Sequence, residues 1–139
     1  IKLKIEKKLY IGNLNAKRDW GHASDFVRAM WLIMQQKKPD DFVISTGEQH
    51  SVREFIELAA KELNIKIKWK GKGFKEKGYD QKGNCIIECN KKYFRPLDVD
   101  TLLGNSAKAK KILKWKPKIS FTKLIKEMVK KDLKTLQSN

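Results

Sequence analysis

Two irregular segments of this 139-residue chain each carry an arginine in a setting that suits phosphate binding. They are NLNAKRDWGH, residues 13–22 with Arg18, and YFRPLDVD, residues 93–100 with Arg95. Of the 32 basic residues in the chain, only four are arginine. Because a planar guanidinium group binds phosphate or carboxylate through two parallel hydrogen bonds, an arginine in a lysine-rich chain indicates such a contact. Two arginines converging on a diphosphate would form a nucleotide clamp, and Asp98 could accept hydrogen bonds from ribose hydroxyls.

Carboxylates close to each arginine in the sequence offer a second interpretation. In it, Arg18 pairs with Asp19 or Asp25, and Arg95 pairs with Asp98 or Asp100. Spacing alone leaves both interpretations open, because an ion pair and a phosphate contact use the same guanidinium geometry.

The common catalytic and metal-binding motifs are missing from the sequence. It contains no GxSxG and no HExxH, and no tyrosine is followed by a lysine at the fourth position. A glycine pattern that starts at Gly71 fails as a dinucleotide loop at Glu76. Cys85 and Cys89 would lie roughly 13 Å apart on one face of a strand, beyond disulfide reach, and no CxxC is present. We therefore expect no catalytic residue, no cofactor-binding loop and no metal site in this chain.

The net charge of +16 is unevenly distributed along the chain. Residues 1–60 carry +2 and residues 61–139 carry +14. The lysines of the second half stand singly or in pairs among apolar residues, which is typical of the solvated faces of strands and helices. Base readout in DNA relies on arginine, so nucleic acid is not the expected partner, although a basic binding module stays the alternative from another functional class.

Neither a membrane span nor a secretory signal is indicated by the hydropathy pattern. No apolar run approaches the eighteen or so residues that a transmembrane helix needs, and the charged start IKLKIEKK leads into no long apolar stretch. Two free thiols fit a reducing compartment. We expect a cytoplasmic protein with no membrane partner.

Hydrophobic periodicity in the first half of the chain predicts alternating helices and strands. The expected elements are helical turns at 1–8, a strand at 8–13, a helix from Ser24 or Asp25 to about residue 36, a buried strand at 41–46, and a helix to about Leu63 that opens with the capping box of Ser51 and Glu54. A strand, a tight turn and a helix over 41–63 are the ingredients of a parallel α/β sheet.

The second half of the chain is expected to continue the α/β pattern. We expect a strand at 65–71, a glycine-rich hairpin or insertion at 71–84, a strand at 85–90, a short helix capped by Asn105 or Ser106, and a final helix capped by Ser120. No internal repeat or interdomain linker is evident. The predicted fold class is therefore α/β.

Two long stretches of the sequence resemble the GDP-mannose 4,6-dehydratase family of extended short-chain dehydrogenase/reductase enzymes. RDWGHASDFVRAMW and YFRPLDVDTLLGN carry the resemblance, which extends over essentially the whole chain. It implies an NADP-dependent lyase that converts GDP-mannose to GDP-4-dehydro-6-deoxy-mannose, the precursor of GDP-fucose and related sugars. It also implies a Rossmann-type fold and a cytoplasmic dimer or tetramer.

The resemblance covers only the C-terminal, substrate-binding part of such an enzyme. Residues 1–139 are thus expected to bind the GDP-sugar, with 41–63 as a late strand–helix unit of the Rossmann sheet and with the NADP-binding part absent. The positions that match the family's substrate-binding residues are Arg18 and Arg95 on the diphosphate, Asp98 near the ribose, and Lys17 and Asn13 near the guanine and its ribose. We interpret Trp20 and His22 as residues that pack the loop.

Function is therefore expected to be GDP-mannose 4,6-dehydratase activity of a longer protein, with this chain alone inactive. A related nucleotide-sugar epimerase or reductase is the nearest alternative, because the substrate-binding part alone separates these enzymes poorly.

Overall fold

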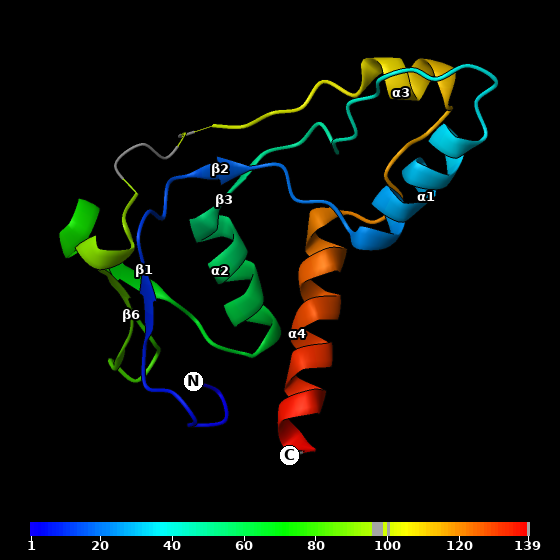
Figure 1. Cartoon of the computed structure of the whole chain (residues 1–139). Helices are drawn as coiled ribbons and strands as arrows, with labels where there is room; N and C mark the ends of the chain where they lie inside the picture. Colours follow the sequence, from blue (N-terminus) through cyan, green and yellow to red (C-terminus); the bar gives the residue numbers. More distant parts are fainter. Residues whose placement is uncertain (96–98, 100, 139) are drawn as a thin grey trace. The chain divides into compact units, whose positions relative to one another are not determined.

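The chain divides into two compact units, each assembled from two stretches of sequence (Figure 1). A computed structural model describes residues 1–95, 99 and 101–138. The first unit, the sheet unit, comprises Ile1–Ala16 and Ser51–Asp100. The second, the helix unit, comprises Lys17–His50 and Thr101–Asn139.

A four-stranded mixed sheet with strand order β1-β6-β5-β4 organises the sheet unit. Its strands are β1 (Leu9–Ile11), β4 (Lys68–Lys70), β5 (Lys77–Tyr79) and β6 (Cys85–Cys89). β1 runs parallel to β6, whereas β5 is antiparallel to both β4 and β6. The structure confirms the α/β class. The glycine-rich segment at 71–84, predicted as a hairpin or insertion, contains β5 and the two turns on either side of it.

Helix α2 (Val52–Glu62) packs its apolar face against this sheet. Ile56 of the helix belongs to one buried cluster with Leu14, Ile86, Ile87 and Cys89. The predicted capping box is present, since the Ser51 hydroxyl accepts from the Glu54 amide at 3.1 Å and the Ser51 amide donates to the Glu54 carboxylate at 2.6 Å. Local sequence thus places the start of α2, and burial of its apolar face holds it there.

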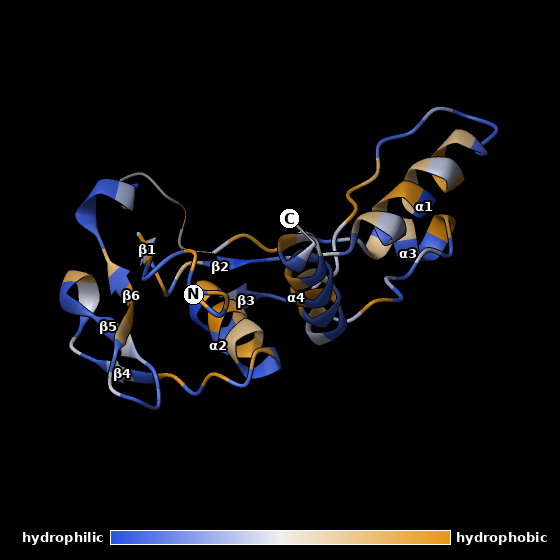
Figure 2. Cartoon of the chain, turned by 90° about the horizontal axis from the view of Figure 1, so that it is seen from below, coloured by the Kyte–Doolittle hydropathy of each residue, from blue (hydrophilic) through white to orange (hydrophobic). Residues whose placement is uncertain are grey.

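The helix unit contains three helices among its described residues: α1 (Ala23–Met34), α3 (Ala107–Ile112) and α4 (Phe121–Gln137). α1 and α3 lie side by side in both views (Figures 1 and 2), and Ala29, Ala109, Leu113 and Trp115 form a buried cluster. Trp115 has no exposed surface. Its indole nitrogen donates to the backbone carbonyl of Asp25 at 2.8 Å. That bond satisfies the one polar atom of the buried indole.

Short irregular elements connect these helices and strands. β2 (Lys17–Arg18) and β3 (His50–Ser51) form a two-stranded sheet, and Lys17 makes a parallel bridge with Thr101. Two 3-10 turns, η1 (Gly73–Lys75) and η2 (Lys91–Tyr93), belong to the sheet unit. Among the described residues, no helix has the length and apolar character needed to cross a bilayer.

Three sequence-based expectations about local structure are wrong. Residues 1–8 form turns rather than a helix, and residues 41–46 are not assigned to a strand. A strand requires a ladder partner, and apolar periodicity alone does not supply one. The cap of α1 is His22 rather than Ser24 or Asp25, because the His22 ring accepts from the Ser24 amide while the Asp25 carboxylate is used elsewhere.

Candidate functional site

Asn13 and Arg95, two of the predicted substrate-binding residues, follow neighbouring parallel strands of the sheet unit. Asn13 comes after the end of β1 at Ile11, and Arg95 comes after the end of β6 at Cys89. Because β1 and β6 are parallel and adjacent, both segments leave the sheet at the same edge. The carboxyl-terminal edge of parallel strands is the usual ligand-binding edge of α/β folds. The structure therefore brings the segments of Asn13 and Arg95 together, and the Arg95 side chain is exposed to solvent.

Gly12 allows the two segments to approach closely. A Cβ atom built on Gly12 would lie 2.1 Å from the carbonyl oxygen of Tyr93 and 3.0 Å from the amide nitrogen of Phe94. Both are backbone atoms, so no side-chain rotation could relieve the overlap. Glycine at this position is thus a steric requirement for the placement of Asn13 beside the segment that leads to Arg95.

The loop after Asn13 is anchored by hydrogen bonds from both sides. The Asn13 side-chain oxygen accepts from the Asn15 amide at 2.9 Å, which closes an Asx-type turn. The first two amides of α2 donate to the carbonyls of Leu14 and Ala16 at 2.9 and 3.1 Å. A small cavity of about 200 Å³ lies beside this loop. Its lining includes Asn13, Phe74 and Phe94, so Asn13 contributes a polar group to a partly aromatic hollow.

Arg53 braces the same loop, a role that the sequence analysis missed. Its guanidinium donates to both carboxylate oxygens of Glu76, at 2.8 and 2.9 Å, and lies 4.7 Å from the ring centre of Trp69. A longer bond of 3.4 Å reaches the side-chain oxygen of Asn15. The bonds to Glu76 raise the pKa of Arg53 above its ordinary value. The sequence did contain a signal for this role, because Arg53 is one of only four arginines in the lysine-rich chain.

Lys17 and Arg18 lie together in β2 of the helix unit. One Arg18 Nη atom donates to the Lys17 carbonyl at 2.8 Å, and the Lys17 side chain is exposed. Thr101, which bridges to Lys17, exchanges two hydrogen bonds with the amide group of Gln49, at 2.7 and 2.9 Å. The strand that presents Arg18 is therefore tied to the segment after residue 100.

Asp19, the residue after Arg18, is fully used in fixing a neighbouring loop. One carboxylate oxygen accepts from the Thr46 amide at 2.9 Å and from the Thr46 hydroxyl at 2.6 Å. The other oxygen accepts from the Gly47 amide at 2.9 Å. The buried Asp25 carboxylate likewise accepts from the amides of Lys118 and Ile119, at 2.9 and 3.0 Å. Both carboxylates that the sequence offered as ion-pair partners of Arg18 thus accept hydrogen bonds from backbone amides.

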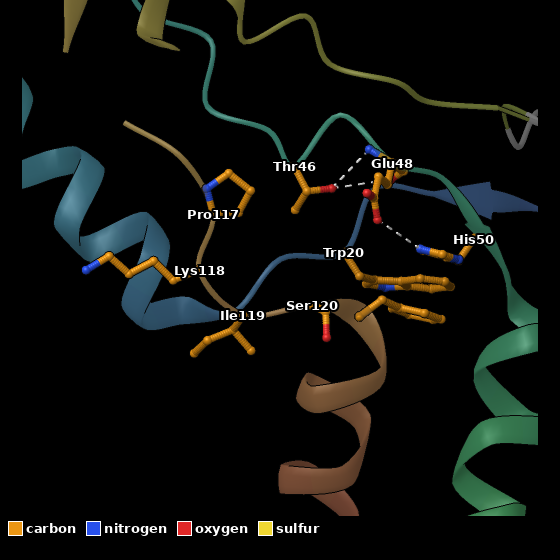
Figure 3. Close-up of a pocket in the computed structure, with 9 residues that line it drawn as sticks. Trp20, Thr46, Glu48, His50, Pro117, Lys118, Ile119 and Ser120 are labelled. Carbon is orange, nitrogen blue, oxygen red and sulfur yellow. Dashed lines mark hydrogen bonds and ion pairs between the residues drawn. The ribbon is translucent and has the colours of Figure 1, made fainter. Parts of the chain in front are cut away.

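Trp20 and His22 pack the helix unit, as the sequence analysis expected. Trp20 stacks on the buried Phe121 ring at 5.6 Å, and His50 stacks on the same ring at 3.9 Å. Trp20 and His50 line a cavity of about 220 Å³ together with Thr46, Glu48 and Ser120 (Figure 3). His22 caps α1 and contacts Glu127 of α4 at 3.3 Å. These contacts hold the loop that follows Arg18.

The four predicted binding residues that the structure describes are distributed over both units. Asn13 and Arg95 belong to the sheet unit, and Lys17 and Arg18 belong to the helix unit. Asp98 lies outside the described residues. Convergence of Arg18 and Arg95 on one diphosphate stays a prediction.

A model of the family described as GDP-mannose 4,6 dehydratase matches residues 1–128. That match covers nearly all of the chain, so it decides the family. The chain belongs to the GDP-mannose 4,6-dehydratase family. The matched range, residues 1–128, includes every segment that bears a predicted binding residue.

Curated proteins agree with this family assignment. The chain is similar to the GDP-mannose 4,6 dehydratase of Dictyostelium discoideum, with 58% identity over 131 residues that make up 94% of this chain and 37% of that protein. GDP-mannose 4,6 dehydratase 2 of Caenorhabditis elegans is 49% identical over 100% of the chain and 36% of its own length. The human GDP-mannose 4,6 dehydratase is 48% identical over 93% of the chain and 35% of its own length. The chain spans little more than a third of each relative.

Solved structures of longer proteins share the fold of this chain over about a third of their length. The dTDP-glucose 4,6-dehydratase of Bacillus anthracis, in complex with NAD, matches with a TM-score of 0.71 and 21% identity over 94% of this chain and 36% of its own. The UDP-glucose 4-epimerase of Bifidobacterium longum, in complex with NAD⁺ and UDP, matches with a TM-score of 0.71 and 15% identity over 97% of this chain and 37% of its own. Both support a Rossmann-type, extended short-chain dehydrogenase/reductase fold.

The glycine run near Gly71 does not form a dinucleotide-binding loop. The only glycine run that begins like a dinucleotide loop includes Gly71, and it forms a turn with η1 between β4 and β5 rather than a strand-to-helix turn. No group of three His, Cys, Asp or Glu side chains able to hold a metal ion occurs in the described part of the chain.

Proposed function

We propose that this chain is the GDP-sugar-binding part of a GDP-mannose 4,6-dehydratase, a lyase that forms GDP-4-dehydro-6-deoxy-mannose. The observation that carries the proposal is the family match over residues 1–128, together with 58% identity to the Dictyostelium relative. The meeting of the Asn13 and Arg95 segments at the carboxyl edge of parallel strands adds geometric support.

The proposed roles follow the chemistry of the individual side chains. Arg18 and Arg95 bind the diphosphate, because guanidinium groups pair with phosphate oxygens in a bidentate geometry. Lys17 and Asn13 approach the guanine and its ribose, with Asn13 held in place by its turn to Asn15. Asp98, outside the described residues, accepts from a ribose hydroxyl.

NADP is the cofactor proposed for the whole enzyme. When bound, it would accept a hydride from the substrate and later return it. We propose that the residues of this chain do not hold NADP, and that they contribute binding and orientation of the GDP-sugar and no catalytic group. The chain alone should therefore not turn over GDP-mannose when NADP is supplied, and measurable turnover would refute this. The whole enzyme is proposed to be a cytoplasmic dimer or tetramer.

A second candidate is the substrate-binding part of a related nucleotide-sugar epimerase or reductase. Solved UDP-glucose 4-epimerases share the fold, with the Thermotoga maritima enzyme at a TM-score of 0.68 and 24% identity. Competition among GDP, UDP and dTDP for binding to this chain separates the two candidates. The main proposal predicts that GDP binds at least ten times more tightly than UDP or dTDP. Preference for UDP or dTDP would favour the second candidate.

A further inference from the structure

The four-stranded sheet of the sheet unit carries lysines on the face that points away from α2. Ile67 and Trp69 pack against the buried cluster between the sheet and α2. Lys66, Lys68 and Lys70 alternate with these two residues and are exposed. Because successive side chains of a strand point to opposite faces of the sheet, the three lysines lie on the face opposite α2.

A single cross-strand row on this face joins all four strands. Tyr10 of β1 lies opposite Glu88 of β6, and Glu88 lies opposite Lys77 of β5. Lys77 in turn lies opposite Lys70 of β4. Directly opposed residues have their Cβ atoms about 4.5–5.5 Å apart. The row therefore places two lysines side by side at one end and a tyrosine at the other.

The positive charge of this face is only partly neutralised. Glu88, the one carboxylate of the row, accepts from Lys8 at 2.8 Å and lies 3.3 Å from the Lys77 ammonium group. These two lysines hold the pKa of the Glu88 carboxyl below its ordinary value. Lys68 and Lys70 form no ion pair with any residue that the structure describes. Like charges opposite each other destabilise a sheet, so the pairing of Lys70 with Lys77 is not explained by stability.

Two tyrosine rings stand among these lysines. Tyr79 of β5 lies opposite Lys68, and the Lys70 ammonium group lies 5.3 Å from the centre of the Tyr79 ring. Tyr10 is 45% exposed and contacts no other ring or cation within the described residues. An exposed ring on a flat sheet is a platform on which a nucleic-acid base can stack.

Lysine and tyrosine together favour a single-stranded nucleic acid over other polyanions. Lysine is a compact point charge that contacts phosphate without reading the bases. Aromatic rings add affinity only for a partner that has bases to stack, which an acidic peptide or a phospholipid headgroup lacks. Nucleic acid was not expected from the sequence because base readout relies on arginine, but binding that is independent of base sequence does not need it.

We propose that this surface, the basic face, binds single-stranded nucleic acid without base specificity. The lysines contact phosphates and the exposed Tyr10 ring stacks on a base. The basic face consists of Tyr10, Lys66, Lys68, Lys70, Lys77 and Tyr79. The proposal goes beyond GDP-sugar binding and does not depend on it, because it uses a face of the sheet rather than its carboxyl edge.

Salt dependence of binding tests the lysines. Fluorescence anisotropy follows a labelled oligouridine of about 15 nucleotides, which matches the upper site size of a single small fold. For three or four phosphate contacts, the plot of log K against log salt should have a slope of about −2 to −3. The double variant Lys68→Gln/Lys70→Gln should bind more weakly at low salt and flatten the slope by about 1.4. Lys126→Gln/Lys130→Gln, at exposed positions of α4, removes the same charge and should leave the slope unchanged.

Substitution of Tyr10 tests the stacking contact. Tyr10→Leu should weaken oligouridine binding by about 5- to 150-fold, because it removes the ring. Tyr10→Phe keeps the ring and should stay within about twofold of the wild type. Tyr10 is exposed, so the urea midpoints of both variants should match that of the wild type, which separates lost binding from lost folding.

Several outcomes would overturn the proposal. They are no binding of oligouridine at low salt, equal losses in the two lysine double variants, and equal affinities of Tyr10→Leu and Tyr10→Phe. Binding to phosphatidylserine vesicles in place of oligouridine would assign the basic face to a membrane surface. Displacement of oligouridine by GDP would assign the binding to the GDP-sugar site. GDP binding, measured separately without oligouridine, tests the proposed function, so the two failures can be told apart.

Discussion

Asp19 holds Thr46 by two hydrogen bonds to one carboxylate oxygen, from the Thr46 amide at 2.9 Å and from its hydroxyl at 2.6 Å. Asp19 is also the residue after Arg18. The anchor to Thr46 therefore fixes the direction in which the chain leaves β2 and, with it, the position from which the Arg18 guanidinium extends. The Asp19 carboxylate therefore serves the loop that follows Arg18.

Replacement of Asp19 by alanine should loosen that loop. The change removes bonds to two amides and one hydroxyl, and bonds to a charged acceptor are stronger than neutral ones. We expect the free energy of unfolding to fall by about 2–3 kcal/mol, measured by urea denaturation. Thr46→Ser keeps the hydroxyl and serves as the control, with an expected loss below about 1 kcal/mol. Equal stability of Asp19→Ala and the wild type would contradict the anchor.

Gly12→Ala should be strongly destabilising although it adds a single methyl group. The new Cβ would lie 2.1 Å from the Tyr93 carbonyl oxygen, so backbone must move. We expect a loss of about 3 kcal/mol. Gly73→Ala is the matched control, because its Cβ would have no atom within 4 Å and only the positive φ of 55° adds strain, which costs about 1 kcal/mol. Similar losses in the two variants would show that steric contact at Gly12 is unimportant.

Arg53→Lys tests the brace on the loop that carries Asn13. Lysine keeps the charge but cannot donate to both oxygens of Glu76 or stack flat on Trp69. The variant should lose about 1–2 kcal/mol of unfolding free energy in urea. Arg28→Lys, at an exposed position of α1, should change it by less than about 0.5 kcal/mol. An equal effect at both positions would exclude a special role for Arg53.

The two cysteines should differ in reactivity with alkylating reagents. Burial raises the pKa of Cys89, and the nearby Glu76 carboxylate adds to the shift. A raised pKa lowers the thiolate fraction at a given pH, and the thiolate is the reactive form. At pH 8, iodoacetamide should label Cys85, which is partly exposed, several times faster than Cys89, as followed by peptide mass spectrometry. The difference should vanish in denaturant, and faster labelling of native Cys89 would contradict the burial.

Elements specified by adjacent residues were predictable from the sequence. The capping box of Ser51 and Glu54 and the cap at Ser120 lie where the sequence placed them, because both signals depend on residues within one helical turn. Parallel pairing of β1 with β6 was not predictable, since it joins segments far apart in the chain.

Long-range contacts explain the errors. Asp25 has the residue type of a helix cap, yet its carboxylate accepts from Lys118 and Ile119, and His22 caps α1 instead. Segment 41–46 has the hydrophobicity of a buried strand but is not assigned to one. The importance of arginine in a lysine-rich chain was recognised, but Arg53, on a helix rather than in a loop, was overlooked.

Binding of GDP to single and double arginine variants tests the central claim most directly. By calorimetric titration, Arg18→Ala and Arg95→Ala should each weaken GDP binding by roughly 2–4 kcal/mol, about 30- to 700-fold, if diphosphate charge is left unpaired. Arg28→Ala, on the exposed surface of α1, should leave the affinity unchanged. Because the two arginines contact one diphosphate, the double variant should deviate from additivity. Wild-type affinity in both single variants would contradict the diphosphate clamp.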